Sequence, residues 1–220
     1  MKFNLPFCSV CQLPSKMSEE VCKFAYDGQL GILKHKTEAN SGLLTEKDKN
    51  GRVPLHWACS GSHSDVVEFL LNQNVPIDAR DDANWTPLMI ASSAGGLNIV
   101  KMLVQRGAQV NAVNSTGQTS LHYAASKDRY EIAEVLLEHA CDANVGDCFG
   151  HTPLHRVSSK GHSKVLKLLL RYNTNVNTRD SRGNTPLHMA CEDDMMEEAK
   201  LLIQHGARID ILNKVEYTKA

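Results

Sequence analysis

Apolar residues gather in short clusters along the chain, and each cluster has the spacing of an amphipathic helix. Residues three and four positions apart lie on one face of a helix, and four clusters show this spacing: Val66, Val67, Leu70 and Leu71; Ile99, Val100, Leu103 and Val104; Ile132, Leu136 and Leu137; and Val165, Leu166, Leu169 and Leu170. Equivalent residues of successive clusters lie 33 positions apart. A period of this length predicts a chain built by stacking one small unit, with the clusters forming a continuous core.

A second, shorter helix is predicted before each cluster. Proline is favoured at the first position of a helix, and a threonine just before it can cap the free amides. Five such starts recur with the same period, at Pro54, Pro87, Ser120, Pro153 and Pro186. Small residues then allow neighbouring units to approach closely, at Ala58, Ala91, Ala124 and Ala190, with Val157 as the exception. Turn-forming residues end the short helix, at Ser62, Gly95, Asp128, Gly161 and Asp194.

Polar residues between the units predict a projecting turn. They are Asp81, Asn114, Asp147, Asp180 and Asn213, residue types that stabilise turns. The whole unit is therefore turn, helix, loop, helix, and its short helix starts with Thr-Pro-Leu-His-x-Ala or a close variant. This pattern resembles the ankyrin repeat family. The resemblance implies an all-α solenoid of stacked helix-loop-helix units, with β-turn or hairpin fingers and a concave groove.

The period divides the chain into repeats of unequal completeness. We expect five full repeats, at residues 48–80, 81–113, 114–146, 147–179 and 180–212. Residues 17–47 have an apolar face without the Thr-Pro-Leu-His start and are predicted to be a degenerate capping repeat, preceded by a flexible leader over residues 1–16. Residues 213–220 match only the start of a seventh repeat. We therefore expect the apolar face of the sixth unit to be poorly covered, including Leu201, Leu202 and Ile209.

The histidines of the repeated motif invite a catalytic or metal-binding interpretation. They are His56, His122, His155 and His188, with Met89 in the one remaining slot. Catalysis needs a unique constellation, whereas these are copies, so we interpret them as structural hydrogen-bonding groups. Cys8 and Cys11 form a lone Cys-x-x-Cys, which is half a zinc site; a metal or redox function there is the alternative to a loosely attached leader. We expect no enzyme activity and no cofactor.

Composition narrows the class of partner. The chain has 220 residues, 24 basic and 25 acidic side chains and a net charge of −1. Bulk charge therefore favours neither nucleic acid nor a membrane surface. Seven cysteines at irregular spacing suit a reducing compartment. We expect a monomer in the cytoplasm and nucleus that binds other proteins.

Binding information is expected at the positions that vary between repeats. The x of Leu-His-x-Ala is predicted to face the groove, giving Trp57, Ile90, Tyr123, Arg156 and Met189. Arg52, Asp82 and Trp85 lie at the fingertips, and Lys127 lies one helical turn beyond Tyr123. Exposed Trp, Tyr and Arg dominate interface energetics, so the predicted protein-binding residues are Arg52, Trp57, Asp82, Trp85, Tyr123, Lys127 and Arg156. The alternative is that one or two of the aromatic rings pack between repeats.

Longer stretches resemble one branch of the family. Leu55-His56-Trp57-Ala58-Cys59-Ser60, Gln109-Val110-Asn111-Ala112-Val113-Asn114 and Leu121-His122-Tyr123-Ala124-Ala125-Ser126-Lys127 closely resemble the gankyrin family of proteasome assembly chaperones. The resemblance implies that the concave face holds the C-terminal domain of a proteasomal base ATPase. It also implies that Arg52 and Lys127 contact acidic side chains of that domain, and that Asp82 and Trp85 belong to the same surface.

The resemblance implies further partners, among them a ubiquitin ligase and a cyclin-dependent kinase. Met189, Cys191 and Asp193 match a family Leu-x-Cys-x-Glu segment linked to the retinoblastoma protein, but two of the three motif residues are changed, which argues against that partner. The leading hypothesis is an assembly chaperone for the 26S proteasome regulatory particle. The alternative is a generic ankyrin adaptor, in cell-cycle or transcriptional control, that binds a different acidic protein.

Overall fold

The computed structural model describes residues 16–214, which form a single row of stacked helix pairs. Six helices make an inner row: α1 (Lys16–Tyr26), α3 (Pro54–Ser60), α5 (Pro87–Ala94), α7 (Ser120–Ser126), α9 (Pro153–Lys160) and α11 (Pro186–Glu192). Six make an outer row: α2 (Leu30–Glu38), α4 (Ser64–Asn72), α6 (Leu97–Gln105), α8 (Tyr130–Glu138), α10 (Ser163–Leu170) and α12 (Met196–Gln204). A short 3-10 helix, η1 (Ser41–Leu44), follows α2. Each helix packs against its partner, and the inner helices and the outer helices from α4 onward also pack against their counterparts in neighbouring repeats. The predicted all-α repeat solenoid is confirmed.

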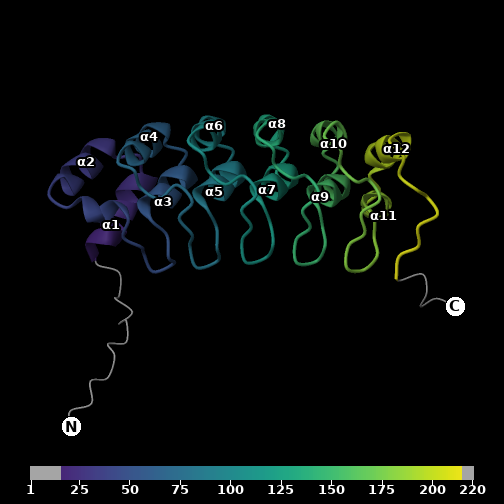
Figure 1. Cartoon of the computed structure of the whole chain (residues 1–220), viewed down its shortest axis with the longest axis horizontal. Helices are drawn as coiled ribbons and strands as arrows, with labels where there is room; N and C mark the ends of the chain where they lie inside the picture. The colour runs from purple at the N-terminus through teal and green to yellow at the C-terminus, as the bar shows by residue number, and fades with distance from the viewer. Residues whose placement is uncertain (1–15, 215–220) are drawn as a thin grey trace, which may run out of the picture.

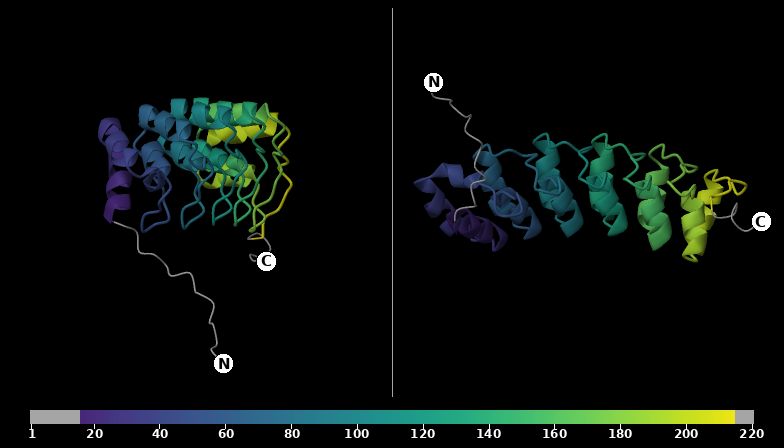
Figure 2. Two further views of the ribbon diagram at one scale, coloured as in Figure 1. Left: turned by 60° about the vertical axis from the view of Figure 1, so that its left-hand side comes forward. Right: turned by 90° about the horizontal axis from the view of Figure 1, so that it is seen from below.

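The fingers extend from one side of the two helical rows (Figures 1 and 2). Within residues 16–214 they contain no strand, yet one backbone hydrogen bond links each finger to the next. The five bonds measure 2.8–3.1 Å and run from the amides of Asp82, Ser115, Cys148, Ser181 and Lys214 to the carbonyls of Asn50, Ala83, Thr116, Phe149 and Arg182. Successive fingers are therefore joined to one another by backbone hydrogen bonds, although their residues are not assigned to strands.

The core is continuous from α1 to α12. The leucine that follows each helix-starting proline or serine is fully buried in four repeats, at Leu55, Leu88, Leu121 and Leu154. The predicted small positions are also fully buried, and Val157, the exception in sequence, is accommodated at 0 % exposure. Because each repeat buries its apolar face only against its neighbours, stability is shared along the stack.

The C-terminal repeat departs in part from expectation. Leu202 was expected to be poorly covered, but it is fully buried, and Leu201 packs against the core. The expectation was wrong for these two because the pairing of α12 with α10 and α11 covers them. Ile209 is 80 % exposed, in line with the expectation. At the other end Lys16, assigned to the leader from sequence, is the first residue of α1, and the rest of that segment lies outside the described residues.

In three repeats the motif histidine joins the inner helix to the finger that follows it. In His155, Nδ1 accepts the amide of Thr152 at 3.1 Å, and Nε2 lies 3.1 Å from the carbonyl of Asn184. Since a carbonyl only accepts, Nε2 must carry the proton and the ring is neutral. His56 and His122 make the same pair of contacts. The structural interpretation of these histidines therefore has a specific basis: each one caps its own helix and fastens the next repeat.

Asparagine side chains fasten the opposite edge of the repeats. Asn111, Asn144 and Asn177 each accept a backbone amide of the next repeat at 2.8 Å through Oδ1. Their Nδ2 atoms donate to carbonyls of that same repeat at 3.2–3.5 Å. Both edges of the stack are thus joined by side-chain hydrogen bonds that recur with the period.

The neutral histidines predict an acid-sensitive stack. Burial lowers the pKa of His155 from 6.5 to about 4, and it also lowers the pKa values of His56 and His122. A histidine whose pKa is lowered by folding binds fewer protons in the folded state than in the unfolded state. Its contribution to the free energy of unfolding is therefore complete above pH 6.5 and is lost as pH falls towards 4. For His155 the contribution is about 3 kcal/mol.

Urea unfolding of the wild type and of His155→Met measures the pH-dependent contribution of His155 to stability. Methionine already fills the equivalent slot at Met89, where it is fully buried, so the substitution is sterically matched. We expect the stability difference between the two proteins to narrow by about 3 kcal/mol between pH 7 and pH 4. Met89→Leu changes the equivalent buried slot without removing a titratable group, so it is the control and should leave the pH dependence unchanged. A constant difference for His155→Met would contradict the assignment.

Candidate functional site

The candidate site is the surface between the inner helices and the fingers, here called the groove. The fourth residue of five inner helices, α3, α5, α7, α9 and α11, lines it, at Trp57, Ile90, Tyr123, Arg156 and Met189. Ile90 is buried at 7 % exposure, whereas the other four keep part of their side chain exposed. The groove is therefore mixed in character, with aromatic, cationic and apolar side chains at one structural position.

A carboxylate or amide at the base of each finger shapes the turn. Its Oδ1 accepts the backbone amides two and four residues later at 2.7–3.1 Å, in Asp48, Asp81, Asn114, Asp147 and Asp180. Because one oxygen is sufficient for the turn, the second polar atom of each side chain remains available to the groove.

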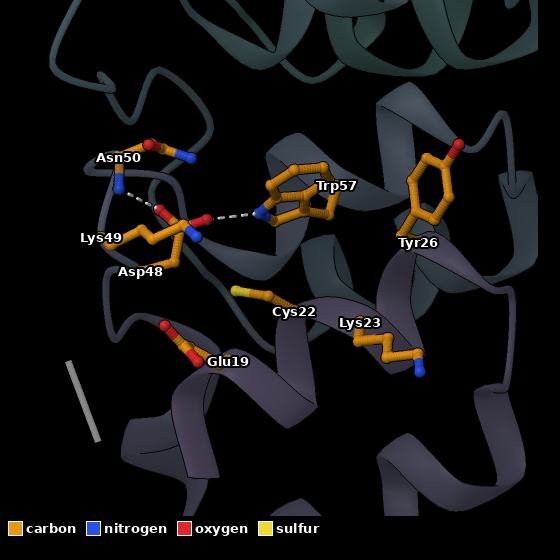
Figure 3. A pocket seen from close by; sticks show the side chains of 8 residues that line it. All are labelled: Glu19, Cys22, Lys23, Tyr26, Asp48, Lys49, Asn50 and Trp57. Carbon is orange, nitrogen blue, oxygen red and sulfur yellow. Dashed lines mark hydrogen bonds between the residues drawn. The ribbon is translucent and has the colours of Figure 1, made fainter. Parts of the chain in front are cut away.

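That second atom holds a groove residue nine positions later. Asp48 Oδ2 accepts the indole N–H of Trp57 at 2.9 Å (Figure 3). Asn114 Nδ2 donates to the hydroxyl of Tyr123 at 2.8 Å. Asp147 Oδ2 accepts a hydrogen bond from Arg156 Nη2 in an ion pair, and the Asp147 side chain is 1 % exposed. Burial opposes ionisation of Asp147, yet the amides of His151 and Phe149 together with Arg156 hold its pKa below the ordinary value.

Where the groove residue is apolar, a nitrogen donor from the preceding finger takes its place. Arg52 Nε donates to Asp81 Oδ2 at 3.0 Å, and His151 Nε2 lies 3.2 Å from Asp180 Oδ2. Arg52 also lies over the Trp57 ring, 5.2 Å from its centroid. Its side chain is therefore held in position from two directions.

The aromatic residues pair with one another along the groove. The Trp85 and Tyr123 rings lie 4.3 Å apart between centroids, and Tyr26 meets Trp57 edge to face at 5.8 Å. Trp57 and Trp85 also pack partly against the core. These rings thus contribute to repeat packing and still present a part of their surface to the groove, so the two interpretations made from sequence are compatible.

Three of the predicted residues meet in one hollow. Arg52, Trp85 and Lys127, from three successive repeats, line a hollow of about 350 Å³ together with Ser60, Ile90, Ser93, Ala94 and Arg129. We call it the basic niche. Arg129, which sequence analysis did not single out, donates to the carbonyl of Ala94 at 3.4 Å. No local pattern marks it, because Arg129 is the residue before α8 and meets Arg52 and Trp85 only through the stacking of repeats.

The other predicted residues lie outside the basic niche. Trp57 lines a separate hollow against α1, Tyr123 and Arg156 are engaged by the finger bases, and Asp82 is exposed at the fingertip. The backbone amide of Asp82 donates to Asn50 at 3.1 Å. These residues share one face of the molecule without forming a single cluster.

The same register positions line a second hollow three repeats later. Adding 99 to the residue numbers of Arg52, Trp85, Ile90, Ser93 and Ala94 gives His151, Asn184, Met189, Glu192 and Asp193. These line a hollow of about 350 Å³ with Phe149, Asp180, Ser181 and Arg182. We call it the acidic niche, because Glu192 and Asp193 replace a serine and an alanine. The groove therefore changes its electrostatic character from one half to the other.

The residues of the altered Leu-x-Cys-x-Glu segment do not act as one unit. Met189 and Asp193 line the acidic niche, whereas Cys191 lines a different hollow with Leu187, His188 and Ile203. The helix α11 separates them, because successive residues of a helix point to different sides. This geometry agrees with the sequence changes in arguing against a retinoblastoma-type motif.

Two of the buried cysteines have thiols that do not ionise readily. Burial raises the pKa of Cys22 and of Cys141 to about 12, so both thiols are neutral at physiological pH. Within residues 16–214 no cluster of histidine, cysteine and carboxylate side chains has the arrangement of a metal site, and no helix there is long and apolar enough to cross a membrane. Cys8 and Cys11 lie outside the described residues.

Comparison with known proteins identifies the class. Three overlapping stretches match the family described as Ankyrin repeats (3 copies): residues 21–114, 77–147 and 139–213. Together they span almost all of the described chain. The protein therefore belongs to the ankyrin repeat family, whose fold and groove it displays.

Individual relatives point to one branch of that family. The chain is 50% identical over 66 residues to the 26S proteasome non-ATPase regulatory subunit 10, or gankyrin, of Homo sapiens, and equally so to that of Rattus norvegicus. It is 45% identical over 47 residues to the probable 26S proteasome regulatory subunit p28 of Saccharomyces cerevisiae. The aligned stretches cover 30% and 20% of this chain and 29% and 21% of those relatives, less than a third of their length. The predicted resemblance is confirmed over these stretches, and the chain is a gankyrin homologue consistent with a protein-binding scaffold.

The paired finger bases predict a double substitution that restores stability. Asp147→Asn removes the charge opposite Arg156 and places an amide donor against the guanidinium, so we expect a loss of about 2 kcal/mol. Adding Arg156→Tyr recreates the Asn114 and Tyr123 pair of the preceding repeat, and most of the loss should be recovered.

Chemical denaturation of the two single variants and the double variant gives the coupling free energy between the positions. The exposed turn residue Asp128, changed to Asn, is the control for loss of one negative charge and should alter stability little. Additive losses at positions 147 and 156 would contradict the proposed pairing.

Proposed function

We propose that this protein is a non-enzymatic assembly chaperone for the 26S proteasome regulatory particle, acting in the cytoplasm and nucleus. In this proposal its groove holds the C-terminal domain of a base ATPase. The observation that carries it is the basic niche, in which Arg52 and Lys127 come together beside Trp85. The homology to proteasome regulatory subunits supplies the partner class.

The basic niche suits an acidic side chain on a partly apolar protein surface. Arg52 uses Nε for Asp81, and within residues 16–214 its two terminal nitrogens form no hydrogen bond or ion pair. Lys127 is exposed and has no ion pair in the same part of the chain. A guanidinium already held in position loses little entropy on binding a carboxylate, and charge pairs of this kind mainly set recognition and association rate.

A generic ankyrin adaptor is the second candidate. The alignment to gankyrin covers only 30% of the chain, and the acidic niche gives the far half of the groove a chemistry that a different partner can also use. A ubiquitin ligase or a cyclin-dependent kinase as partner rests on the family resemblance alone. Recovery of such proteins without proteasomal ATPases from cell extracts would favour the adaptor.

Charge reversal in the basic niche tests the proposal. We expect the wild type to bind a purified C-terminal domain of a base ATPase, with affinity that falls as salt rises. Arg52→Glu combined with Lys127→Glu should weaken binding by about tenfold or more, measured by calorimetry. No binding by the wild type to any base ATPase domain, or equal binding by the double variant, would refute the chaperone role.

Two controls separate binding from folding. Lys101→Glu with Lys164→Glu makes the same change of charge on the exposed outer helices α6 and α10 and should leave affinity unchanged. Since glutamate at position 52 would face Asp81, Arg52→Gln with Lys127→Gln is measured in parallel. Helix content by circular dichroism should be the same for all variants.

A further inference from the structure

A hollow beside the basic niche has the character of an anchoring pocket. It lies between α1 and the finger that begins at Asp48, has a volume of about 280 Å³, and is lined by Glu19, Cys22, Lys23, Tyr26, Asp48, Lys49, Asn50 and Trp57 (Figure 3). We call it the aromatic niche. No residue of the repeated motif predicts it, because α1 belongs to the degenerate first repeat.

The floor of the aromatic niche is apolar. Figure 3 shows Trp57 and Cys22 close together, with Tyr26 on the far side of Trp57. The Cys22 thiol is buried and directed to the carbonyl of Arg52, with Sγ to oxygen at 3.9 Å. Tyr26 packs edge to face on Trp57 and still leaves 46 % of its surface exposed. An exposed aromatic wall over an apolar floor favours burial of a further apolar side chain.

Charges around the rim do not select a charged ligand. Glu19 and Asp48 are balanced by Lys23 and Lys49, all of which line the same hollow. Both oxygens of Asp48 are already in use, by the amides of Asn50 and Arg52 and by the indole of Trp57. An ionic side chain would therefore gain little there, whereas an aromatic or leucine side chain would displace water from the rings.

The aromatic niche and the basic niche share a wall. Trp57 lines the first and Arg52 lines the second, and the guanidinium of Arg52 lies over the Trp57 ring. A partner side chain that packs on Trp57 and a partner carboxylate that binds the terminal nitrogens of Arg52 would therefore come from neighbouring positions of one partner surface. We propose that the aromatic niche anchors an aromatic or leucine side chain of the partner, adjacent to the acidic residue that binds Arg52.

This proposal rests on the proposed function for the identity of the partner, but its chemistry can be tested without that partner. The chain contains two tryptophans, Trp57 and Trp85, and each lines a different niche. Their indole N–H signals in ¹H–¹⁵N spectra of the full chain are therefore separate reporters of the two hollows.

Three acetylated tripeptide amides serve as probes. Phe-Glu-Glu is expected to shift both indole signals strongly, and Ala-Glu-Glu to shift that of Trp85 with only a small change at Trp57 transmitted through Arg52. Phe-Lys-Lys should shift Trp57 less than Phe-Glu-Glu does, because Arg52 and Lys127 repel its lysines. Tyr26→Ala should abolish the Trp57 response to Phe-Glu-Glu, while Tyr172→Ala, which removes another partly exposed tyrosine, should leave it intact. An equal Trp57 response to Phe-Glu-Glu and Ala-Glu-Glu would overturn the proposal.

Measured affinity for the ATPase domain tests the anchoring role of the aromatic niche separately from the chaperone role. Tyr26→Ala should weaken binding about tenfold, with Tyr172→Ala unchanged. If Tyr26→Ala binds as well as the wild type while Arg52→Glu with Lys127→Glu does not, the anchor is refuted and the chaperone role stands. If no ATPase domain binds but the peptides shift both indoles as expected, the anchor stands and the chaperone role fails.

Discussion

Three of the junctions between repeats depend on a neutral imidazole, of His56, His122 or His155, that bonds to two repeats at once. The ring accepts an amide at the start of its own helix and donates to a carbonyl at the end of the next finger. In a solenoid the only tertiary contacts are those between neighbours, so this bridge carries the geometry from one unit to the next. Met89 shows what happens without it: the threonine hydroxyl of Thr86 caps the amide of Met89 at 3.3 Å, and apolar burial alone fills the slot.

The side chains at the finger bases also position the residues that face the groove. One oxygen of Asp48, Asp147 or their equivalents shapes the turn, and the second atom holds a side chain that faces the groove. Groove residues are therefore placed by the same side chains that stabilise the fingers. A substitution at a finger base should affect stability and binding together, whereas a change at an exposed residue such as Lys127 should affect binding alone.

The groove is uniform in shape but varied in chemistry. One structural position carries an indole, an isoleucine, a phenol, a guanidinium and a thioether in successive repeats. The scaffold tolerates this because the finger base can bond the groove residue or, when that residue is apolar, a nitrogen of Arg52 or His151 from the preceding finger. The result is three hollows of different character, aromatic, basic and acidic, along one face.

Much of this architecture follows from the sequence by itself. The period, the helix starts at Pro54 and its equivalents, and the buried leucines follow from local patterns, because capping and amphipathic spacing act within one repeat. The tertiary structure alone decided which side chains meet. Arg52, Trp85 and Lys127 are far apart in the chain and converge only because stacking places successive repeats side by side. Leu202 is buried, against expectation, because α10 and α11 cover it. Periodicity places residues in register, but the partner of each side chain depends on distances between repeats that no local pattern encodes.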